Sequence, residues 1–387
     1  MLRNVILRRL AVFVLAGLAL AATGYLSISR AQAPAAKRKG NSGEYNGPMN
    51  RVLLKDYDPT TSLVVAAHHP AKAKFPAIDV HVHPSARTPE QVAAWVKAMD
   101  ETGVETVILM TGATGPDFDR LVDLYLKPYP KRFQLYCGMD TTNIAAPDYP
   151  QRAAAELERC YRRGARGVGE VTDKGRGFGA GTFADAATLK PRDQRLFVDD
   201  RRLDLFWQKC AELKLPVNIH VADHPSAWVP DDNHQERTPN FQHYNQHGLD
   251  VPSHAEVIAK FQTAVERHWR TTFVAVHFSN LGHDFAQLGR ALDRFPNLYV
   301  DLSARDYEFG RQPFTAPVFF AKYKDRILYG SDRGPGVEMW RHWWRMLETR
   351  DEFIKGPAGW QLYGLGLPDE VLRAVYHDNA KRLLNWN

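Results

Sequence analysis

Cysteine is scarce in this chain. Only Cys137, Cys160 and Cys210 occur among its 387 residues. An odd and sparse set of thiols excludes the dense disulfide framework that stabilises small secreted domains. Stability must therefore come from a large hydrophobic core, and 44% of the residues are hydrophobic.

A strong charge of one sign is missing from the part of the chain that is expected to fold. The formal charge is +6, but residues 1–33 hold four arginines and no acidic residue, which leaves +2 for the rest. The Lys-Arg-Lys run at residues 37–39 and Glu44 together contribute this charge of +2, which leaves the rest of the chain formally neutral. A nearly neutral folded part argues against a nucleic-acid-binding surface.

Long hydrophobic runs are absent except for one near the N-terminus. Residues 10–22 are apolar, follow three arginines, and precede the small residues Ala31-Gln32-Ala33. This pattern is typical of a secretory signal peptide, and the run is short for a membrane-spanning helix. We predict a signal peptide over residues 1–33 and export to the periplasm or the medium, with an uncleaved anchor as the alternative.

From residue 75 onward, short β-rich runs alternate with segments of helical spacing, after a linker and N-terminal extension over residues 34–74. This alternation is typical of a parallel sheet, and eight βα units predict a (β/α)₈ TIM barrel over residues 75–387. An open, doubly wound sheet is the alternative. The predicted strands are residues 77–83, 105–111, 133–139, 166–172, 216–222, 272–278, 297–303 and 326–331.

The ends of the predicted strands carry side chains that can bind metals or transfer protons. Catalytic residues of such barrels lie at the C-terminal ends of the strands, and residues two apart on a strand face the same side. Each residue alone could be structural, but their recurrence at strand ends favours one shared site. They are His81 and His83 in "AIDVHVHP", Glu170 in "GVGEV", His220 in "PVNIHVADHP", His277 in "FVAVHFSN" and Asp332 in "ILYGSDRG".

The residue types predict a catalytic divalent metal ion. Imidazole nitrogens and carboxylate oxygens suit zinc, with manganese or iron as alternatives, and an open coordination position can activate water. Asp332 could touch the metal and accept a proton from that water. A further histidine could polarise the carbonyl under attack.

The ordered H-x-H, His, His and G-S-D set on an eight-strand pattern resembles the amidohydrolase superfamily. The terminal "YHDNAKRLL" is similar to the closing helix of its amidohydrolase-related branch (amidohydrolase 2), which includes the aminocarboxymuconate-semialdehyde decarboxylase type. The resemblance covers about residues 75–385. It implies His81, His83, His220 and Asp332 as metal ligands and His277 as the acid/base beside the bound water.

Glu170 leaves the number of metal ions open. TatD-like hydrolases carry a metal-bridging glutamate in a similar Gly-Glu-Val context, so the resemblance implies that Glu170 is a ligand if the site is binuclear. We favour one ion, because no lysine that could be carboxylated stands on the fourth strand. Lys174 lies beyond that strand, in a glycine-rich loop.

Two long loops, residues 173–199 and 223–251, follow the fourth and fifth strands and are expected at the catalytic face. Trp228 in the second loop is a candidate for stacking on a substrate ring. Arg305 and Arg333 follow the last two strands and could bind a substrate carboxylate. The tryptophans at 340, 343 and 344 have the spacing of a buried helix face instead.

These features together predict an exported metal-dependent hydrolase that attacks an amide, ester or lactone carbonyl of a small carboxylate-bearing substrate. The alternatives are a non-oxidative metal-dependent decarboxylase (carboxy-lyase) on the same scaffold and a periplasmic binding protein without turnover. The expected partners are a small anionic molecule and a second copy in a homodimer. Neither nucleic acid nor, after signal cleavage, a membrane is expected.

Overall fold

The computed structural model describes residues 47–384 except residues 54–55, 182–186, 188, 233, 237–242 and 357–359. Contacts divide the chain into two compact units, Met1–Tyr57 and Asp58–Asn387. In the first unit, a short 3-10 helix, η1 (Pro48–Arg51), has no buried residue. The predicted signal peptide lies outside the described residues. Within the described part of the chain, no helix is both long enough and apolar enough to span a membrane.

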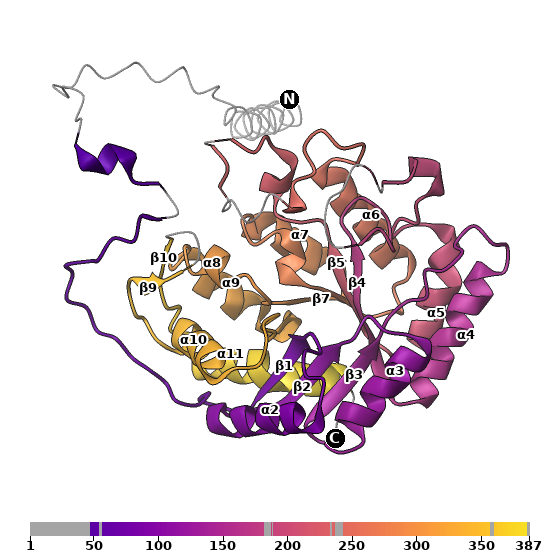
Figure 1. Ribbon diagram of the computed structural model, residues 1–387, viewed down its shortest axis with the longest axis horizontal. Coiled ribbons are helices and arrows are strands. Elements are labelled where there is room, and N and C mark those ends of the chain that lie inside the picture. The colour runs from indigo at the N-terminus through magenta and orange to yellow at the C-terminus, as the bar shows by residue number, and fades with distance from the viewer. Residues whose placement is uncertain are drawn as a thin grey trace, which may run out of the picture. The chain divides into compact units, whose positions relative to one another are not determined.

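The second unit is built on an eight-stranded sheet whose strand order follows the chain (Figure 1). Every neighbouring pair is parallel. The predicted strands are confirmed, although several are shorter than expected. The strands are β1 (Ala77–Val82), β2 (Val104–Met110), β3 (Phe133–Cys137), β4 (Ala165–Asp173), β5 (Val217–Val221), β6 (Phe273–Ala275), β7 (Leu298–Asp301) and β8 (Ile327–Leu328).

The last strand returns to the first, so the sheet forms a nearly closed barrel. Just after β8, the carbonyl oxygen of Tyr329 accepts a hydrogen bond from the amide of Val80 in β1 at 2.9 Å. Further along the same segment, the amide of Asp332 donates a hydrogen bond to the carbonyl oxygen of His81 at 2.8 Å. The (β/α)₈ prediction is confirmed and the open-sheet alternative is wrong.

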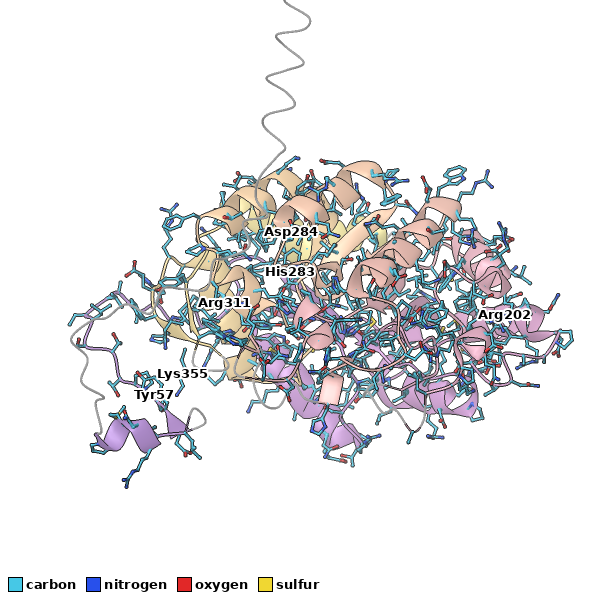
Figure 2. The ribbon with its side chains drawn as sticks, turned by 90° about the horizontal axis from the view of Figure 1, so that it is seen from above. Tyr57, Arg202, His283, Asp284, Arg311 and Lys355 are labelled. Carbon is cyan, nitrogen blue, oxygen red and sulfur yellow. The ribbon has the colours of Figure 1, made fainter. Side chains whose placement is uncertain are left out.

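Helices connect the strands, and local sequence signals set their ends. Thr88 caps α2 in a reciprocal capping box with Gln91, and Gly103 ends this helix with a left-handed φ of 82°. Asp284 caps α7 by accepting a hydrogen bond from the amide of Gln287 (Figure 2). The α-helices are α2 (Pro89–Thr102), α3 (Gly115–Leu121), α4 (Tyr149–Arg162), α5 (Asp204–Glu212), α6 (His254–Arg267), α7 (Phe285–Arg294), α8 (Asp306–Phe309), α9 (Thr315–Tyr323), α10 (Val337–Glu348), α11 (Asp369–Arg373) and α12 (Asn379–Leu383). A small antiparallel pair, β9 (Ile354–Lys355) and β10 (Gln361–Leu362), follows α10.

The core has two parts. A small apolar cluster joins Ile78 and Val80 of β1 to residues of β2, β6 and β8 and to Ala380 of α12. A much larger cluster lies between the sheet and the surrounding helices, and α10 contributes three fully buried tryptophans to it. Their predicted role in helix packing is confirmed. Burying one such large side chain contributes about 1.5–3 kcal/mol, so this layer can replace the missing disulfides as the source of stability.

Candidate metal centre and active site

The side chains predicted from the strand ends gather at one mouth of the barrel. His81 lies near the end of β1, and His83 directly follows that strand. Glu170 lies in β4 and His220 in β5. His277 follows β6, and Asp332 follows β8. Two overlapping groups have ligand atoms that all lie within 4.8 Å of one another. The first group is His81, His83 and Asp332, and the second is His81, Glu170 and His277.

His81 is fully buried and held by a carboxylate. Its Nδ1 lies 2.9 Å from Oδ2 of Asp301, the last residue of β7. The Nε2 atom on the other side of the ring is buried without a hydrogen-bond partner. Its nearest carboxylate oxygens are those of Asp332 at 3.5 Å and Glu170 at 3.8 Å. A metal-ligating histidine shows this arrangement, with one nitrogen fixed and the other free.

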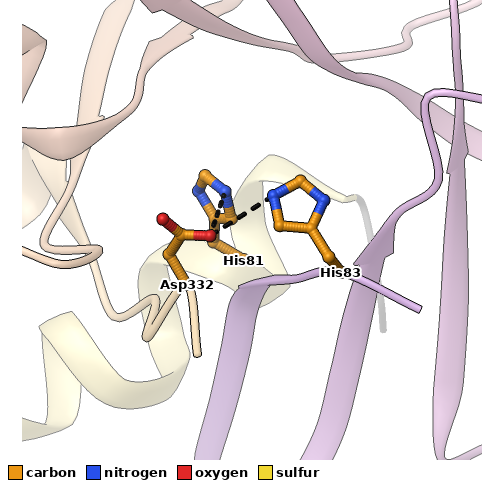
Figure 3. A group of neighbouring side chains, drawn as sticks. All are labelled: His81, His83 and Asp332. Carbon is orange, nitrogen blue, oxygen red and sulfur yellow. Dashed lines mark ion pairs between the residues drawn. The ribbon is translucent and has the colours of Figure 1, made fainter. Parts of the chain in front are cut away.

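His83 repeats this arrangement at the rim. Its Nδ1 lies 3.1 Å from the carbonyl oxygen of Met110, which fixes the proton on that nitrogen. Its Nε2 lies 3.3 Å from Oδ1 of Asp332 and 3.3 Å from Oε2 of Glu170. Figure 3 shows one carboxylate oxygen of Asp332 facing the rings of both His81 and His83.

These separations fit a shared metal ion better than hydrogen bonds. The nitrogen–oxygen distances of 3.3–3.8 Å among His81, His83, Glu170 and Asp332 exceed ordinary hydrogen-bond lengths. Two ligands bound about 2.1 Å from a tetrahedral ion lie about 3.4 Å apart. Together with the unpartnered Nε2 of His81, the residues present fit a divalent ion with nitrogen and oxygen ligands.

His277 faces the same centre from a tight turn. Its Nδ1 lies 2.8 Å from the carbonyl oxygen of Ser303, so Nδ1 carries a proton. Its Nε2 points to Glu170 at 3.4 Å and to Asp332 at 3.9 Å. Residues 277–280 all have positive φ values between 51° and 58°. Such a run is costly for residues other than glycine and is characteristic of functional sites.

His220 lies beside the centre but has a different environment. Its Nδ1 is 2.7 Å from Oε1 of Glu170, and its Nε2 is 3.1 Å from Oδ1 of Asp223. Both ring nitrogens are therefore hydrogen-bonded to carboxylates, and His220 is not in either group of candidate ligands. Asp223 is paired in turn with the buried Lys174 at 3.0 Å. The role of His220 as a metal ligand stays a prediction.

The electrostatic environments of the histidines differ. Burial alone would lower the pKa values of His81 and His83. The neighbouring carboxylates outweigh burial and raise these pKa values to about 9 for His81 and about 10 for His83. At His277, burial together with the charges of His220 and Arg305 lowers the pKa to about 4. At neutral pH, Nε2 of His277 is thus unprotonated, while Nε2 of His81 and His83 holds a proton that a metal ion would displace.

Metal binding is therefore expected to strengthen as pH rises. A metal ion must compete with protons on His81 and His83, so its apparent affinity should increase until both pKa values, about 9 and about 10, are passed. We expect a gain of roughly tenfold or more per pH unit between pH 6.5 and 8.5, since at least one proton is released on binding. Calorimetric titration of the metal-free protein with manganese at three pH values measures this. An affinity that does not change with pH would contradict it.

The sequence reasoning missed the residues that hold the ligands in place. Asp301 bonds His81 and also accepts a hydrogen bond from the amide of His277 at 2.8 Å. Asp79 accepts bonds from the amide and hydroxyl of Ser331 and from the indole of Trp340, which fixes the turn before Asp332. Burial raises the pKa of Asp79 to about 6. Asp301 could have been found, because it lies near the C-terminal end of the seventh predicted strand, residues 297–303, as the other site residues lie near the ends of theirs.

An Asp301→Asn substitution tests this supporting role. The amide keeps the size of the side chain but removes the charge that fixes the proton of His81 on Nδ1. We expect metal affinity to fall by about 10- to 100-fold, which is typical for partners of metal-bound histidines. Metal titration of this variant beside wild type measures the loss. Unchanged affinity would show that His81 does not depend on Asp301.

The three predicted substrate-binding residues have partners inside the protein. Arg305 is buried, donates to the side chain of Asn280, and lies 3.4 Å from Glu308. Arg333 donates to both carboxylate oxygens of Asp306, and Trp228 donates to the carbonyl oxygen of Pro252. These contacts were not foreseen, because the sequence does not reveal which acidic group faces each arginine. Direct substrate binding by these residues stays a prediction.

Comparison with known proteins identifies the family. The amidohydrolase family model matches residues 78–386. A search of curated proteins found no match. Among solved structures, 2,6-dihydroxybenzoate decarboxylase from Rhizobium is 15% identical with a TM-score of 0.51, covering 80% of this chain and 99% of that one. A dihydroxybenzoic acid decarboxylase from Polaromonas sp. JS666, with bound manganese and the inhibitor 2-nitroresorcinol, is 16% identical with a TM-score of 0.50, covering 81% of this chain and 97% of that one. At these identities the solved structures support the fold alone.

Proposed function

We propose, from the premise that the chain belongs to the amidohydrolase family, that it is a metal-dependent hydrolase. Its proposed substrates are amides, esters or lactones of small carboxylate-bearing compounds. One observation carries the proposal. Two overlapping groups of ligand atoms, each within 4.8 Å, bring the imidazoles of His81, His83 and His277 together with the carboxylates of Asp332 and Glu170.

The geometry supports the following assignment of metal-binding residues. His81, His83 and Asp332 would hold the ion, with Glu170 beside them and His220 as a further candidate. We propose zinc, and manganese is supported as the alternative by the Polaromonas structure. A divalent ion bound there would act as a Lewis acid that polarises a carbonyl and lowers the pKa of water.

The protein's own part in the reaction centres on His277. Because Nδ1 donates to Ser303, Nε2 is the atom that can accept a proton from the attacking water. The same atom can then return the proton to the departing nitrogen or oxygen. Asp332 lies 3.9 Å from this Nε2 and offers a second acceptor for the proton. His277 itself is buried, which limits the access of bulk water to its ring.

Product analysis tests the proposal. The metal-loaded full chain would be incubated with the carboxylate-bearing ester acetylsalicylate and amide hippurate, beside the uncharged phenyl acetate, acetanilide and dihydrocoumarin, and new carboxylate would be titrated at constant pH. Carboxylate release that needs the metal and is lost with His277→Asn would support a hydrolase. If a protein that demonstrably holds its metal releases no carboxylate from a wider set of amides, esters and lactones, the hydrolase proposal is wrong.

Decarboxylation is the second candidate, and the names of two solved structures with this fold are the reason to test it. Two of the structures that share this fold are named as decarboxylases of dihydroxybenzoic acids. Carbon dioxide released from 2,6-dihydroxybenzoate, without any new carboxylate from the esters and amides, would identify a carboxy-lyase. Ligand binding without turnover of either substrate class would favour a binding protein.

We also propose that the protein is exported. The support is the arginine-flanked apolar run within residues 1–33 and the small residues at 31–33. N-terminal sequencing of the protein recovered from a periplasmic fraction tests this. A start near residue 34 is expected, and an intact N-terminus found only in the cytoplasm would contradict export.

A further inference from the structure

Lys174 is a buried cation beside the metal centre, and no step of the proposed reaction uses it. Only 3% of its side chain is exposed, and its Nζ lies 3.0 Å from Oδ1 of Asp223. The same Oδ1 atom lies 3.1 Å from Nε2 of His220. On the other side of that ring, Nδ1 lies 2.7 Å from Oε1 of Glu170. These contacts form a continuous chain from the lysine to the metal centre.

The sequence at the start of the first long loop explains why Lys174 is buried. Asp173, the last residue of β4, accepts hydrogen bonds through Oδ1 from the amides of Gly175 at 2.9 Å and Gly177 at 3.1 Å. Both glycines have left-handed φ values, +86° and +81°, which glycine adopts without strain. A Cβ atom on Gly175 would lie 2.9 Å from Cγ2 of Val257. The loop therefore turns tightly after β4, and Lys174 stays close to the strand ends.

The second long loop encloses Lys174 from another side. The Nζ atom lies 4.6 Å from the centre of the Tyr244 ring, within the range of a cation–π interaction. The side-chain amide of Gln246 donates a hydrogen bond to the carbonyl oxygen of Lys174 at 2.6 Å. Both long loops thus meet at this lysine. Because its side chain is enclosed in this way, Lys174 acts on neighbouring protein groups and not on a substrate.

Stability alone does not explain the buried pair of Lys174 and Asp223. Removing two charges from water costs free energy that their attraction often fails to return, and apolar side chains of similar size often stabilise a protein at least as well. A carboxylate bonded to one nitrogen of a histidine, in contrast, fixes the orientation of the ring and the position of its proton. Asp223 is such a carboxylate for His220, and Lys174 holds it in place.

We propose that Lys174 is a positioning residue, which holds Asp223 against Nε2 of His220 and thereby keeps Nδ1 of His220 facing the metal centre. From there, Nδ1 can bind the ion or hold the carboxylate of Glu170 beside it, and either role depends on this orientation. The inference rests on the proposed function in one respect, since it requires that a divalent metal ion binds at the centre.

A double variant separates positioning from stability. Lys174→Met/Asp223→Leu replaces the ion pair with apolar side chains of similar size, so its melting temperature should change by less than about 5 °C. Its affinity for manganese, measured by calorimetric titration of the metal-free full chain, should fall by about 10- to 100-fold, because His220 loses the partner of its Nε2. An affinity within about twofold of wild type would show that the pair is only structural and would overturn the proposal.

A single variant keeps the test decisive if the double variant does not fold. Lys174→Met leaves Asp223 without its cation, so manganese affinity should again fall by about tenfold or more. Lys260→Met is the matched control. Lys260, on α6, also pairs with an aspartate, Asp199 at 3.3 Å, and also lies over an aromatic ring, Phe197 at 4.9 Å. This control should bind manganese as wild type does. If Lys174→Met binds manganese as tightly as the control, Lys174 has no positioning role.

These results can be separated from failure of the hydrolase proposal, because they do not require turnover. If manganese affinity falls as expected but the wild-type protein hydrolyses no ester, amide or lactone, the positioning role stands and the reaction assigned to the site is wrong. If hydrolysis occurs and the Lys174 variants bind manganese as wild type does, the reaction stands and the positioning role is wrong.

Discussion

A His277→Asn variant is expected to keep its metal and to lose roughly 10²- to 10⁴-fold in kcat, the usual contribution of a general acid/base. The Nε2 atom of histidine can gain and lose a proton. The side-chain amide of asparagine is neither an acid nor a base near neutral pH. Asparagine can still donate a hydrogen bond toward Ser303, so the turn should persist. Steady-state kinetics and metal content, measured on the same preparation, test the prediction.

The control for this variant is another buried histidine with a hydrogen-bonded partner. His268 directly follows α6 and is buried. Its Nε2 lies 3.0 Å from a carboxylate oxygen of Asp204, the first residue of α5. A His268→Asn substitution should leave kcat within about twofold of wild type, since the loss of a buried contact away from the site changes stability rather than turnover. If His277→Asn loses no more activity than His268→Asn, His277 is not the acid/base.

The second large effect is expected at Glu170. Burial alone would raise the pKa of this carboxyl, but His220, His277 and His83 outweigh burial and hold the pKa well below its usual value. Glu170 is therefore ionised and in contact with the histidines of the centre. We expect Glu170→Gln to lower metal affinity at least about tenfold and activity at least about 100-fold, because the substitution removes an anion from the metal site.

Metal stoichiometry in this variant also decides between one ion and two. A drop from two ions to one would make Glu170 a ligand of a binuclear site, and weaker binding of a single ion would favour a mononuclear site. Glu156→Gln is the control, because Glu156 lies on α4 and is paired with Arg159 at 2.9 Å. If Glu170→Gln binds metal and turns over as this control does, Glu170 has no direct role.

The fold could be predicted because its pattern is local. Each strand of a barrel is a short β-rich run, and some of the helices carry a capping residue at their start, such as Thr88 before α2 and Ser253 before α6. The rule that such barrels place functional residues at the C-terminal strand ends then predicts that His81, His83, His277 and Asp332 lie together. That prediction depends on the regular alternation of strands and helices and not on any single motif.

The partners of these side chains could not be predicted, because they depend on how the barrel closes. Asp301 lies 220 positions from His81 in the chain, and only closure of the sheet places β7 and β1 around the same ring. The position of Glu170 among four histidines depends in the same way on neighbouring strands. Arg305 was expected to face the substrate, yet its guanidinium pairs with Asn280 and Glu308. Which acid a buried arginine meets is a property of the tertiary structure.

Metal content of the purified full chain, measured by mass spectrometry beside a His81→Ala variant, tests the central claim most directly. We predict at least one zinc or manganese ion per wild-type chain after incubation with both metals, and none in the variant. His81 is the right position to change, because its buried Nε2 has no hydrogen-bond partner and belongs to both candidate ligand groups. A wild-type chain that holds no metal, or a variant that holds as much as wild type, would contradict a catalytic metal centre at this site.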